Sequence, residues 1–413
     1  MSIAWHEPLD LAQYFRDEPY LFLLYSGRKE AHTGRYSYLG VGAAQTKKFQ
    51  SFSEMPENGN WFGYLSYAMR HDVEQYTLSK PTIIDLPAAR FSKPEHLFIF
   101  DHETKTVKYH GKSMPELPKS LDKHQSAPAP IITNLESNFT DDGYITAVEA
   151  TIARIEAGDF YQANLTRKYW GNVSNANHFD IFLRLCESSP APYSAFLKWN
   201  DTAIISSSPE CFLSIDDDNT ITARPIKGSA GRSDNARDDA RIVEELLHSP
   251  KDHAENLMIV DLLRNDLARV SEAGSVHVTE QSGLYSYATI HHLISTIKSK
   301  LKATFSRTDV LRACFPPGSM TGAPKIAAVE WCNLHEKLER GIYSGAIGWL
   351  GEGNQCDFSV VIRTIIIEDN QFEFQVGGGI VADSNPAKEL EETRIKARGI
   401  CKALGITLMQ LQQ

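Results

Sequence analysis

The chain has 413 residues, a formal net charge of −10 and 42% hydrophobic residues. This length and apolar content predict a soluble chain with a sizeable core, organised as one large domain or as two to three smaller ones. The acidic balance argues against nucleic acid or an anionic membrane as a partner, because both attract basic patches. No run of eighteen apolar residues occurs, and acids precede the short apolar run YLFLLY. We therefore expect neither a membrane-spanning helix nor a signal peptide.

The six cysteines are scattered, and none forms a CxxC pair. This pattern signals neither a zinc site nor a redox motif. Isolated cysteines are typical of a reducing compartment, where they serve as small buried apolar residues. The sequence therefore predicts a cytoplasmic protein.

The first part of the chain has a strand pattern. Residues 20–110 alternate apolar and polar side chains in short runs such as RYSYLGVG and HLFIFD, with turn residues between them. Residues 111–140 contain four prolines together with serine and lysine, which favours a crossover linker. We therefore expect a largely β subregion over 1–130, followed by a catalytic region over 140–413. The two are interleaved in one compact unit.

From residue 140 onward, helices and strands are mixed. The last helix is predicted over 386–404, with Asn385 as N-cap and Gly405 after its end. Another begins at Ser249, which we expect to form a capping-box-like pair with Asp252. Further helices are predicted over the segment that ends at Gly158, over 234–248 and from Pro324. Strands are predicted over 161–171, 193–200, 202–208, 211–216, 219–226, 344–351, 356–369 and 371–381. The sequence therefore predicts an α+β fold built on antiparallel strands.

Two of these helices carry acidic pairs. Asp252 and Glu255 lie three residues apart, as do Glu389 and Glu392, so each pair shares a helix face. Solvated faces are the simplest interpretation. However, AENLMIVDLL around Glu255 is largely apolar, and carboxylates on a buried helix need partners. Two such pairs together form an oxygen-rich site that suits Mg²⁺.

Two glycine-containing segments are candidate anion cradles. The segment 376–384, VGGGIVADS, joins a strand to the last helix, and its glycines allow backbone N–H groups close to an anion. The segment 315–325, FPPGSMTGAPK, runs into a helix N-terminus. A tight turn remains an alternative for the first. The spacings of dinucleotide-binding and phosphate-binding loops are absent.

Several isolated polar residues also stand out. Glu210 lies just beyond a strand end in SSSPE, where a solvated turn residue is the ordinary interpretation. Arg363 interrupts the apolar strand SVVIRTIII, so we expect it to have an anionic partner, either structural or a ligand. His291 and His292 precede what is predicted as an apolar helix face. Lys227, in RPIKGSAGR, lies between a proline-stiffened strand end and a glycine.

Taken together, these segments resemble the chorismate-utilising enzyme family. The resemblance covers residues 140–413 densely, through SSSPE, RPIKGS, KDHAENLMIVDLLRNDL, PPGSMTGAPK, YSGAIGW, IRT, GGGIVADS and ELEETRIKA. It reaches back weakly to LLYSG and GRYSYLG. The family fold that it implies is a large two-layered α/β sandwich of antiparallel sheets with helices outside and the site between its halves.

The resemblance also distinguishes branches of the family. Members that aminate chorismate at C4 carry lysine in a PIKGT-like motif, as Lys227 does in PIKGS, whereas anthranilate synthases carry alanine and are the alternative. Members that add water place a lysine where this chain has Gln162. Members regulated by tryptophan carry an LLES-like motif, from which Tyr25 in LLYSG departs. The chain has no glycine-rich nucleophile elbow with cysteine, which implies ammonia from a separate glutaminase subunit or from solution.

The resemblance assigns a role to each motif residue. Lys227 is implied to attack C2 of chorismate as the neutral amine, and Glu210 to protonate the leaving C4 hydroxyl group. His292 lies near the ring in relatives. The implied Mg²⁺ ligands are Glu255 and Glu392, with Asp252 and Glu389 acting through water. The groups implied to bind or support the substrate are Arg363, Tyr343, Gly379, Ser319 and Lys396.

Overall fold

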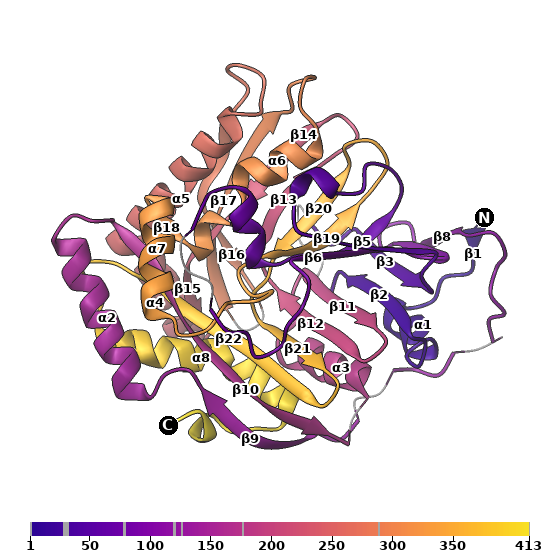
Figure 1. Cartoon of the computed structure of the whole chain (residues 1–413), viewed down its shortest axis with the longest axis horizontal. Coiled ribbons are helices and arrows are strands. Elements are labelled where there is room, and N and C mark those ends of the chain that lie inside the picture. Colours follow the sequence, from indigo (N-terminus) through magenta and orange to yellow (C-terminus); the bar gives the residue numbers. More distant parts are fainter. Residues whose placement is uncertain are drawn as a thin grey trace.

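Two antiparallel β-sheets, packed face to face, form the centre of the molecule (Figure 1). The computed structural model describes residues 2–27, 33–76, 80–118, 121–124, 127–175, 177–287 and 290–412. Over these residues the structure confirms the predicted fold class, a sandwich of antiparallel sheets with helices outside. The N-terminus lies at the right of the molecule in Figure 1 and the C-terminus at the lower left.

The larger sheet has twelve strands among the described residues. In spatial order they are β1 (Ser2–Ile3), β8 (Thr106–His110), β7 (His96–Asp101), β3 (Tyr36–Val41), β2 (Tyr20–Tyr25), β11 (Tyr193–Trp199), β12 (Thr202–Ser208), β21 (Thr364–Glu368), β22 (Gln371–Ile380), β10 (Gln162–Ser174) and β18 (Gly322–Ala323). Strand β9 (Ile131–Ser137) also pairs with β10. The longest ladder joins β10 to β22 over ten residue pairs, so this part of the sheet holds a well-defined register.

The smaller sheet has ten strands in the described part of the chain. Their order is β15 (Ile226–Gly231), β17 (Ile290–Lys300), β14 (Thr220–Arg224), β13 (Cys211–Ile215), β20 (Cys356–Val360), β19 (Ala346–Leu350), β5 (Trp61–Leu65), β6 (Ala89–Lys93) and β4 (Gln45–Phe49). Strand β16 (His277–Ser286) pairs with β17. Strands from 1–130 and from 140–413 therefore share both sheets, while the boundary between these two parts stays a prediction.

A cluster of aromatic and branched side chains fills the space between the sheets. The ring of Trp199 in the larger sheet lies 5.3 Å from that of Phe22 in the same sheet, measured between centroids. It lies 5.8 Å from the ring of Tyr64 in the smaller sheet. All three side chains are almost fully buried. Because each large apolar side chain stabilises the fold by roughly 1.5–3 kcal/mol when buried, this cluster holds the two sheets together.

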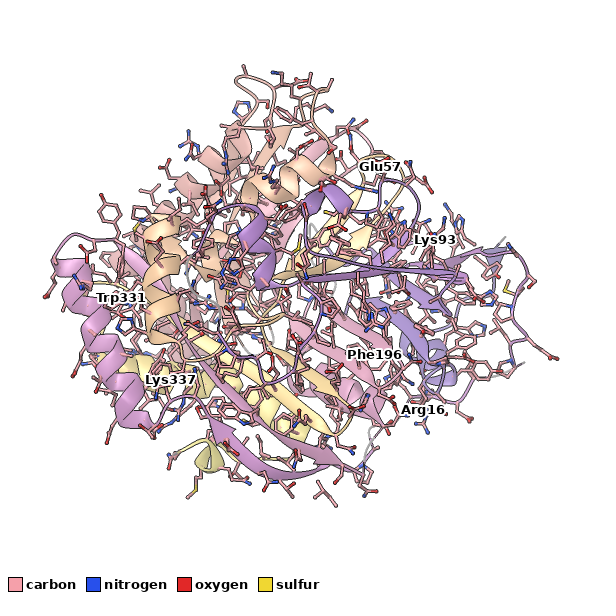
Figure 2. The ribbon with its side chains drawn as sticks, viewed as in Figure 1. Arg16, Glu57, Lys93, Phe196, Trp331 and Lys337 are labelled. Carbon is pink, nitrogen blue, oxygen red and sulfur yellow. The ribbon has the colours of Figure 1, made fainter. Side chains whose placement is uncertain are left out.

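Helices cover the outer faces of both sheets. On the larger sheet lie α1 (Pro8–Tyr14), α2 (Asp141–Glu156), α3 (His178–Ser188) and α8 (Pro386–Leu404), and on the smaller sheet α4 (Ala236–Leu247), α5 (Pro250–Ala268) and α6 (Arg307–Cys314). Helix α7 (Lys325–His335) packs against β10. Figure 2 shows Phe196 among the strands of the larger sheet and Trp331 at the left edge. There the indole N–H of Trp331 donates to Thr151 of α2, 3.0 Å away.

The predicted helix boundaries are confirmed at the two helices that carry the acidic pairs. The Ser249 side chain accepts a hydrogen bond from the N–H of Asp252 at the start of α5, and Asn385 accepts one from Lys388 at the start of α8. Gly405 follows α8 with a φ of 72°, the left-handed conformation that glycine adopts most readily. The capping-box part of the prediction is wrong, because only the serine half of that exchange is present at α5.

The single strand predicted over 356–369 is wrong. The chain forms β20 in the smaller sheet, then crosses to the larger sheet and forms β21. Arg363 lies at the crossing with a φ of 51°, a left-handed conformation that no extended strand contains. Both strands are buried, so the apolar pattern runs through the crossing without a break. The sequence pattern therefore could not show where one strand ends.

Three smaller expectations also differ from the structure. The predicted linker over 111–140 contains β9, which pairs with β10 although Pro130 precedes it. His291 and His292 lie within β17 and do not precede a helix, because the apolar residues that follow alternate along a strand. The glycines of 376–384 lie within β22, as the strand predicted over 371–381 implies, and the tight turn considered as an alternative is not formed there because β10 pairs with them.

Candidate active site

Lys227 lies on β15, at the end of the smaller sheet. Its pairing with β17 is irregular between Ile226 and Ser229, where Gly228 has a φ of 85°. This bulge turns the half-buried Lys227 toward the loop that precedes α7, and its Nζ donates to the carbonyl oxygen of Ser319 at 3.4 Å. Bulges that redirect a side chain in this way are frequent beside active sites.

Glu210 approaches the same loop from the start of β13. It is 5% exposed, and its carboxyl group is hydrogen-bonded to the side chain of Ser319. Burial raises the pKa of Glu210 to about 7, although the hydrogen bond from Ser319 and the charges of Lys227 and Lys396 lower it. A carboxyl group with this pKa is partly protonated at neutral pH, so it can donate a proton.

The two acidic pairs lie close together, one on α5 and one on α8. Lys251 Nζ is 3.9 Å from Glu255 Oε1 and 3.5 Å from Glu389 Oε1, so a single ammonium group links the helices. Lys396 Nζ is 2.7 Å from Glu392 Oε1. The Ser384 hydroxyl donates to Glu389 at 2.7 Å.

The positive charge of Lys227 acts to lower the pKa of one acid in each pair, Glu255 and Glu392. Burial raises the pKa of Glu255, and Lys227 and Lys251 reduce that increase without reversing it. Burial also favours a higher pKa for Glu392, but Lys396 outweighs it, assisted by Lys251 and Lys227, and the pKa is lowered. Because Lys227 also acts on Glu210, its ammonium group lies among carboxylates contributed by three separate elements.

The chemistry of these acids fits a hard cation, but their present arrangement is not converged. The four carboxylates of Asp252, Glu255, Glu389 and Glu392 offer only oxygen donors, which Mg²⁺ prefers. Within the described ranges, no three or more His, Cys, Asp or Glu side chains are arranged to hold a metal ion. Instead, lysines pair with the carboxylates. The metal site therefore stays a prediction.

The glycines of β22 lie between the acidic pair on α8 and Lys227 on β15. A Cβ atom built on Gly378 would lie 3.0 Å from Glu389 Oε2, and one built on Gly379 would lie 2.3 Å from Gln162 Nε2 and 3.5 Å from Lys227 Nζ. Neither position has room for an ordinary side chain without movement of its neighbours. Bare backbone at this point brings a strand within reach of whatever occupies the site.

The remaining predicted residues lie around this centre. Tyr343 is 5% exposed, and burial raises the pKa of its hydroxyl group, to which the charge of Glu210 adds. His292 Nδ1 is 2.6 Å from the hydroxyl oxygen of Ser229 on β15. The carbonyl oxygen of Arg363 accepts from the N–H of Ser207, at the end of β12. The backbone therefore places Arg363 at the strand end that leads to Glu210.

One residue at the site was not predicted. Lys251 lies one helical turn before Glu255, and an acid four residues after a lysine on the same helix was the available signal. Its pKa is raised: burial lowers it, but the charges of Glu389, Glu255 and Glu392 outweigh that effect. Gln162 was used only to separate branches of the family, yet it is 1% exposed and directly contacts the site.

A cavity of about 200 Å³ lies elsewhere, and none of the predicted site residues lines it. Tyr25, which departs from the LLES-like motif, is among its lining residues, together with Arg35, Tyr193, Trp349 and Asp357.

Comparison with known proteins identifies the family. A model of the chorismate binding enzyme family matches residues 12–402. The chain is 36% identical over 355 residues to aminodeoxychorismate synthase component 1 of Escherichia coli, covering 85% of this chain and 78% of that protein. It is 39% identical over 316 residues to the chloroplastic aminodeoxychorismate synthase of Arabidopsis thaliana, covering 75% of this chain but only 34% of the relative. The chain therefore belongs to the chorismate binding enzyme family.

The fold agrees with this assignment. The crystal structure of anthranilate synthase component I from Streptococcus pneumoniae matches with a TM-score of 0.77 and 25% identity, covering 91% of this chain and 94% of that one. None of the helices in the described part of the chain is long and apolar enough to cross a membrane.

Proposed function

We propose that the chain is the chorismate-aminating component of an aminodeoxychorismate synthase. The reaction converts chorismate and ammonia into 4-amino-4-deoxychorismate and water. The observation that carries this proposal is the position of Lys227, whose amine lies on the Ser319 loop beside the proton-donating Glu210. Its similarity to aminodeoxychorismate synthase component 1 of E. coli supports the same assignment.

The first chemical step joins the substrate to the chain. The neutral amine of Lys227 attacks C2 of chorismate, the two conjugated ring double bonds each shift by one position, and the C–O bond at C4 breaks. Glu210 gives its proton to the departing oxygen, so the leaving group is water rather than hydroxide. The buried position of Glu210 keeps this proton available near neutral pH.

The second step reverses the attachment. Ammonia adds at C4, both ring double bonds shift back, and the bond between C2 and the Lys227 nitrogen breaks. The proton that the incoming nitrogen loses balances the one that Glu210 gave in the first step. Pyruvate remains on the substrate as its enolpyruvyl group, so the formation of 4-aminobenzoate for folate synthesis requires a separate lyase.

The ring carboxylate of chorismate binds between the acidic helices. Glu255 and Glu392 would hold Mg²⁺ directly, and Asp252 and Glu389 would assist through water. When bound, Mg²⁺ supplies the positive charge that attracts the ring carboxylate to this wall. The backbone N–H of Gly379 donates to the same carboxylate.

The other end of the substrate is held by cationic and hydroxyl groups. The guanidinium group of Arg363 and the hydroxyl group of Tyr343 bind the enolpyruvyl carboxylate, for which a planar fork is well suited. Ser319 and Lys396 support the ring and the metal ligands. His292 faces the ring from β17, where the hydroxyl group of Ser229 fixes its orientation.

Ammonia comes from a separate glutaminase subunit, and the two chains form a heterodimer. The word component in the name of the E. coli relative supports a multi-component enzyme. We place this enzyme in the cytoplasm, a reducing compartment that suits the six free thiols of the chain, most of which are buried.

Anthranilate synthase component I is the second candidate, because its S. pneumoniae representative shares the fold over nearly the whole chain. An anthranilate synthase adds ammonia at C2, the atom that the amine of Lys227 attacks in the mechanism above. The lysine at this position therefore favours C4 amination.

Product analysis tests the proposal. The purified chain is incubated with chorismate, Mg²⁺ and an ammonium salt, and the products are separated and identified by mass and by the position of the new amino group. We expect 4-amino-4-deoxychorismate with ammonium, and no product with glutamine unless a glutaminase subunit is added. Anthranilate as the main product would support the second candidate. Isochorismate would show that water, rather than ammonia, is the nucleophile.

A further inference from the structure

A buried pair of charged side chains, Arg340 and Glu336, lies next to the proposed site. The Arg340 side chain is 2% exposed, and its guanidinium group uses all three nitrogens. Two of them donate to the carboxylate of Glu336 at 2.7 and 2.8 Å, in a bidentate pair. The third nitrogen, Nη1, donates to the carbonyl oxygen of Met320 at 2.7 Å and to the hydroxyl group of Ser344 at 3.2 Å. Nη2 also donates to the carbonyl oxygen of Asn164 at 2.7 Å.

Glu336, at the end of α7, connects Arg340 to the larger sheet. One of its carboxylate oxygens accepts from both the N–H and the hydroxyl group of Thr166 on β10, at 3.1 and 2.7 Å. Glu336 and Thr166 are buried as completely as Arg340. The burial of Arg340 disfavours its charge, but the negative charge of Glu336 outweighs this and holds the pKa of the guanidinium group well above its usual range.

Three of the segments that Arg340 contacts carry a residue of the proposed site; its other partners are Glu336 and the ring of Tyr67. Met320 follows Ser319, whose carbonyl oxygen binds Lys227 and whose side chain binds Glu210. Asn164 lies two residues beyond Gln162 on β10 and pairs with Gly379. The guanidinium group of Arg340 thus joins the Ser319 turn to β10, which pairs with β22.

The hydrogen bond from Arg340 to Ser344 supports a third segment, the turn that contains Tyr343. Ser344 has a φ of 67°, a conformation that costs energy for any residue with a side chain and persists only where the surroundings fix it. It follows Tyr343, a predicted ligand of the enolpyruvyl carboxylate. The hydrogen bond from Arg340 to the Ser344 hydroxyl group holds this strained turn, and with it the tyrosine.

We propose that Arg340 is a positioning residue for the amination reaction, which holds the Ser319 turn, the Tyr343 turn and β10 at the distances that place Lys227 and Glu210 against the substrate. Arg340 does not touch the substrate. Its effect passes through Ser319 and Tyr343, so this inference rests on the roles given to Lys227 and Glu210 above.

A purely structural ion pair is the competing explanation. Buried pairs of this kind hold segments together without any link to catalysis, and breaking one destabilises the fold. The two explanations differ in what lysine at this position would do. Lysine keeps the charge but lacks the planar fork, so it cannot hold the carbonyl oxygens of Met320 and Asn164 and the Glu336 carboxylate at the same time.

The test compares Arg340→Lys with Arg307→Lys. Arg307 is the matched control: its side chain is also 2% exposed and its guanidinium group binds backbone carbonyl oxygens, those of Gly351, Gln355, Pro56 and Glu57, but none of these belongs to a segment that carries the site. We expect both variants to lose thermal stability. Arg340→Lys alone loses about 100-fold in kcat, the size of effect that a 1 Å displacement of reacting groups produces, with a smaller change in KM for chorismate.

A pH profile gives the specific signature. Ser319 lowers the pKa of Glu210, and Lys227 and Lys396 are the charged groups that act in the same direction. When the Ser319 turn is released, the pKa of Glu210 rises, and its protonated form persists to higher pH. We therefore expect the alkaline limb of kcat/KM to move to higher pH in Arg340→Lys and to stay in place in Arg307→Lys. Ser319→Ala should move the limb in the same direction.

A milder variant keeps the test decisive if Arg340→Lys does not fold. Ser344→Ala removes one partner of Arg340 and leaves the bidentate pair intact, so we expect a several-fold loss in kcat with little loss of stability. Losses in stability with unchanged kcat and an unchanged alkaline limb in the folded variants would overturn the inference. The wild-type product identifies the reaction separately. If wild type forms a different product, the proposed function fails, whereas the ratio of variant to wild-type rates still tests Arg340.

Discussion

One wall of the proposed site is formed by β10 and β22 of the larger sheet, and the other by β15 of the smaller sheet. These two walls are built differently. On the larger sheet, β10 and β22 pair over ten consecutive residues, and the side chains that face the site are 1–5% exposed, as Gln162 and Asn164 show. On the smaller sheet, β15 makes four pairings with an irregularity between them, and Lys227 and Gly228 are half-buried. Lys227, the proposed nucleophile, therefore lies on the less constrained wall, opposite a rigid one.

This contrast follows from what each wall is proposed to do. The larger sheet provides the backbone of β22 and, through α8, two of the four proposed metal ligands, and binding by such groups gains from rigidity. The amine of Lys227 must form a bond with the substrate and break it again, so it needs room to move. The following predictions test whether the two walls are as different as their packing indicates.

The largest effect is expected at Lys227 itself. Lys227→Ala removes the proposed nucleophile, so we expect C4 amination to fall by about 10²–10⁴-fold, the range typical of a positioned catalytic group. The fold should survive because the side chain is only half-buried. The rate and the position of the new amino group are measured at saturating ammonium. Trace amination at C2 is expected, since the emptied position resembles that of the anthranilate-forming relatives.

Lys298→Ala is the matched control for this change. Lys298 is exposed on the neighbouring strand β17, so its loss removes a charge from the same sheet without touching the site. We expect its rate to equal that of wild type. A Lys227→Ala protein that forms the C4 product at the wild-type rate would show that Lys227 is not the nucleophile.

The next effect is expected at the acidic helices. Glu255→Gln removes a charged ligand of the proposed Mg²⁺ site, so we expect at least the roughly 10–100-fold loss of activity that changes next to a metal cause, partly restored at high Mg²⁺. Glu391→Gln on the exposed side of α8 serves as control and should leave activity unchanged. Wild-type activity that persists in excess EDTA would contradict the metal site.

A pH-dependent effect is expected at Glu210. Because its folded-state pKa is about 7 against an ordinary 4.5, the folded chain binds this proton more tightly than the unfolded chain. Its contribution to stability is fully present below pH 4.5 and is lost as pH rises through about 7, to an extent of about 3 kcal/mol. The kcat/KM of wild type should fall over the same upper range, because the general acid loses its proton.

Glu210→Gln separates these two consequences. We expect the variant to lose roughly 10²-fold in rate at every pH. It should be more stable than wild type at pH 8 and no more stable at pH 4.5, as measured by urea denaturation. A stability difference that does not change with pH would show that Glu210 titrates normally. In that case burial has not prepared it to act as an acid.

The sequence predicted the rigid wall better than the less constrained one. Caps and glycines are local signals, so Asn385, Gly405 and the paired acids of α8 could be recognised directly, and the structure confirms that helix. The antiparallel fold class followed from the strand pattern in the same way. The crossing at Arg363 could not be recognised, because both strands beside it are buried and share one apolar pattern.

Contacts that depend on tertiary packing were also beyond the sequence. His291 and His292 belong to a strand whose pairing with β15 and β16 overrides the apparent helix pattern. The part that Lys251 plays between two acids on different helices depends on how α5 packs beside α8. Neither feature has a signal within one segment of the chain.

The smallest effect is expected at the bulge of β15. Gly228 has a φ of 85°, and a Cβ atom there would lie 3.1 Å from the Cβ of Asp252 and 3.1 Å from Leu293. Gly228→Ala should therefore cost about 1–3 kcal/mol of stability, from backbone strain and from this tight contact. Gly231→Ala, on the same strand, is the control: its φ is not in the left-handed region, and no atom lies within 4 Å of its Cβ position, so little change is expected.

The activity of Gly228→Ala tells how much freedom Lys227 has. If the smaller-sheet wall is as loosely held as its pairing indicates, the strand can move by a few tenths of an ångström and the lysine can still reach the substrate. We then expect a rate loss of less than about 10-fold, smaller than the roughly 100-fold that a 1 Å displacement causes. A loss as large as that of Lys227→Ala, in a protein that remains folded, would show that the amine requires one fixed position. The two walls would then be equally rigid where the chemistry occurs, despite their different packing.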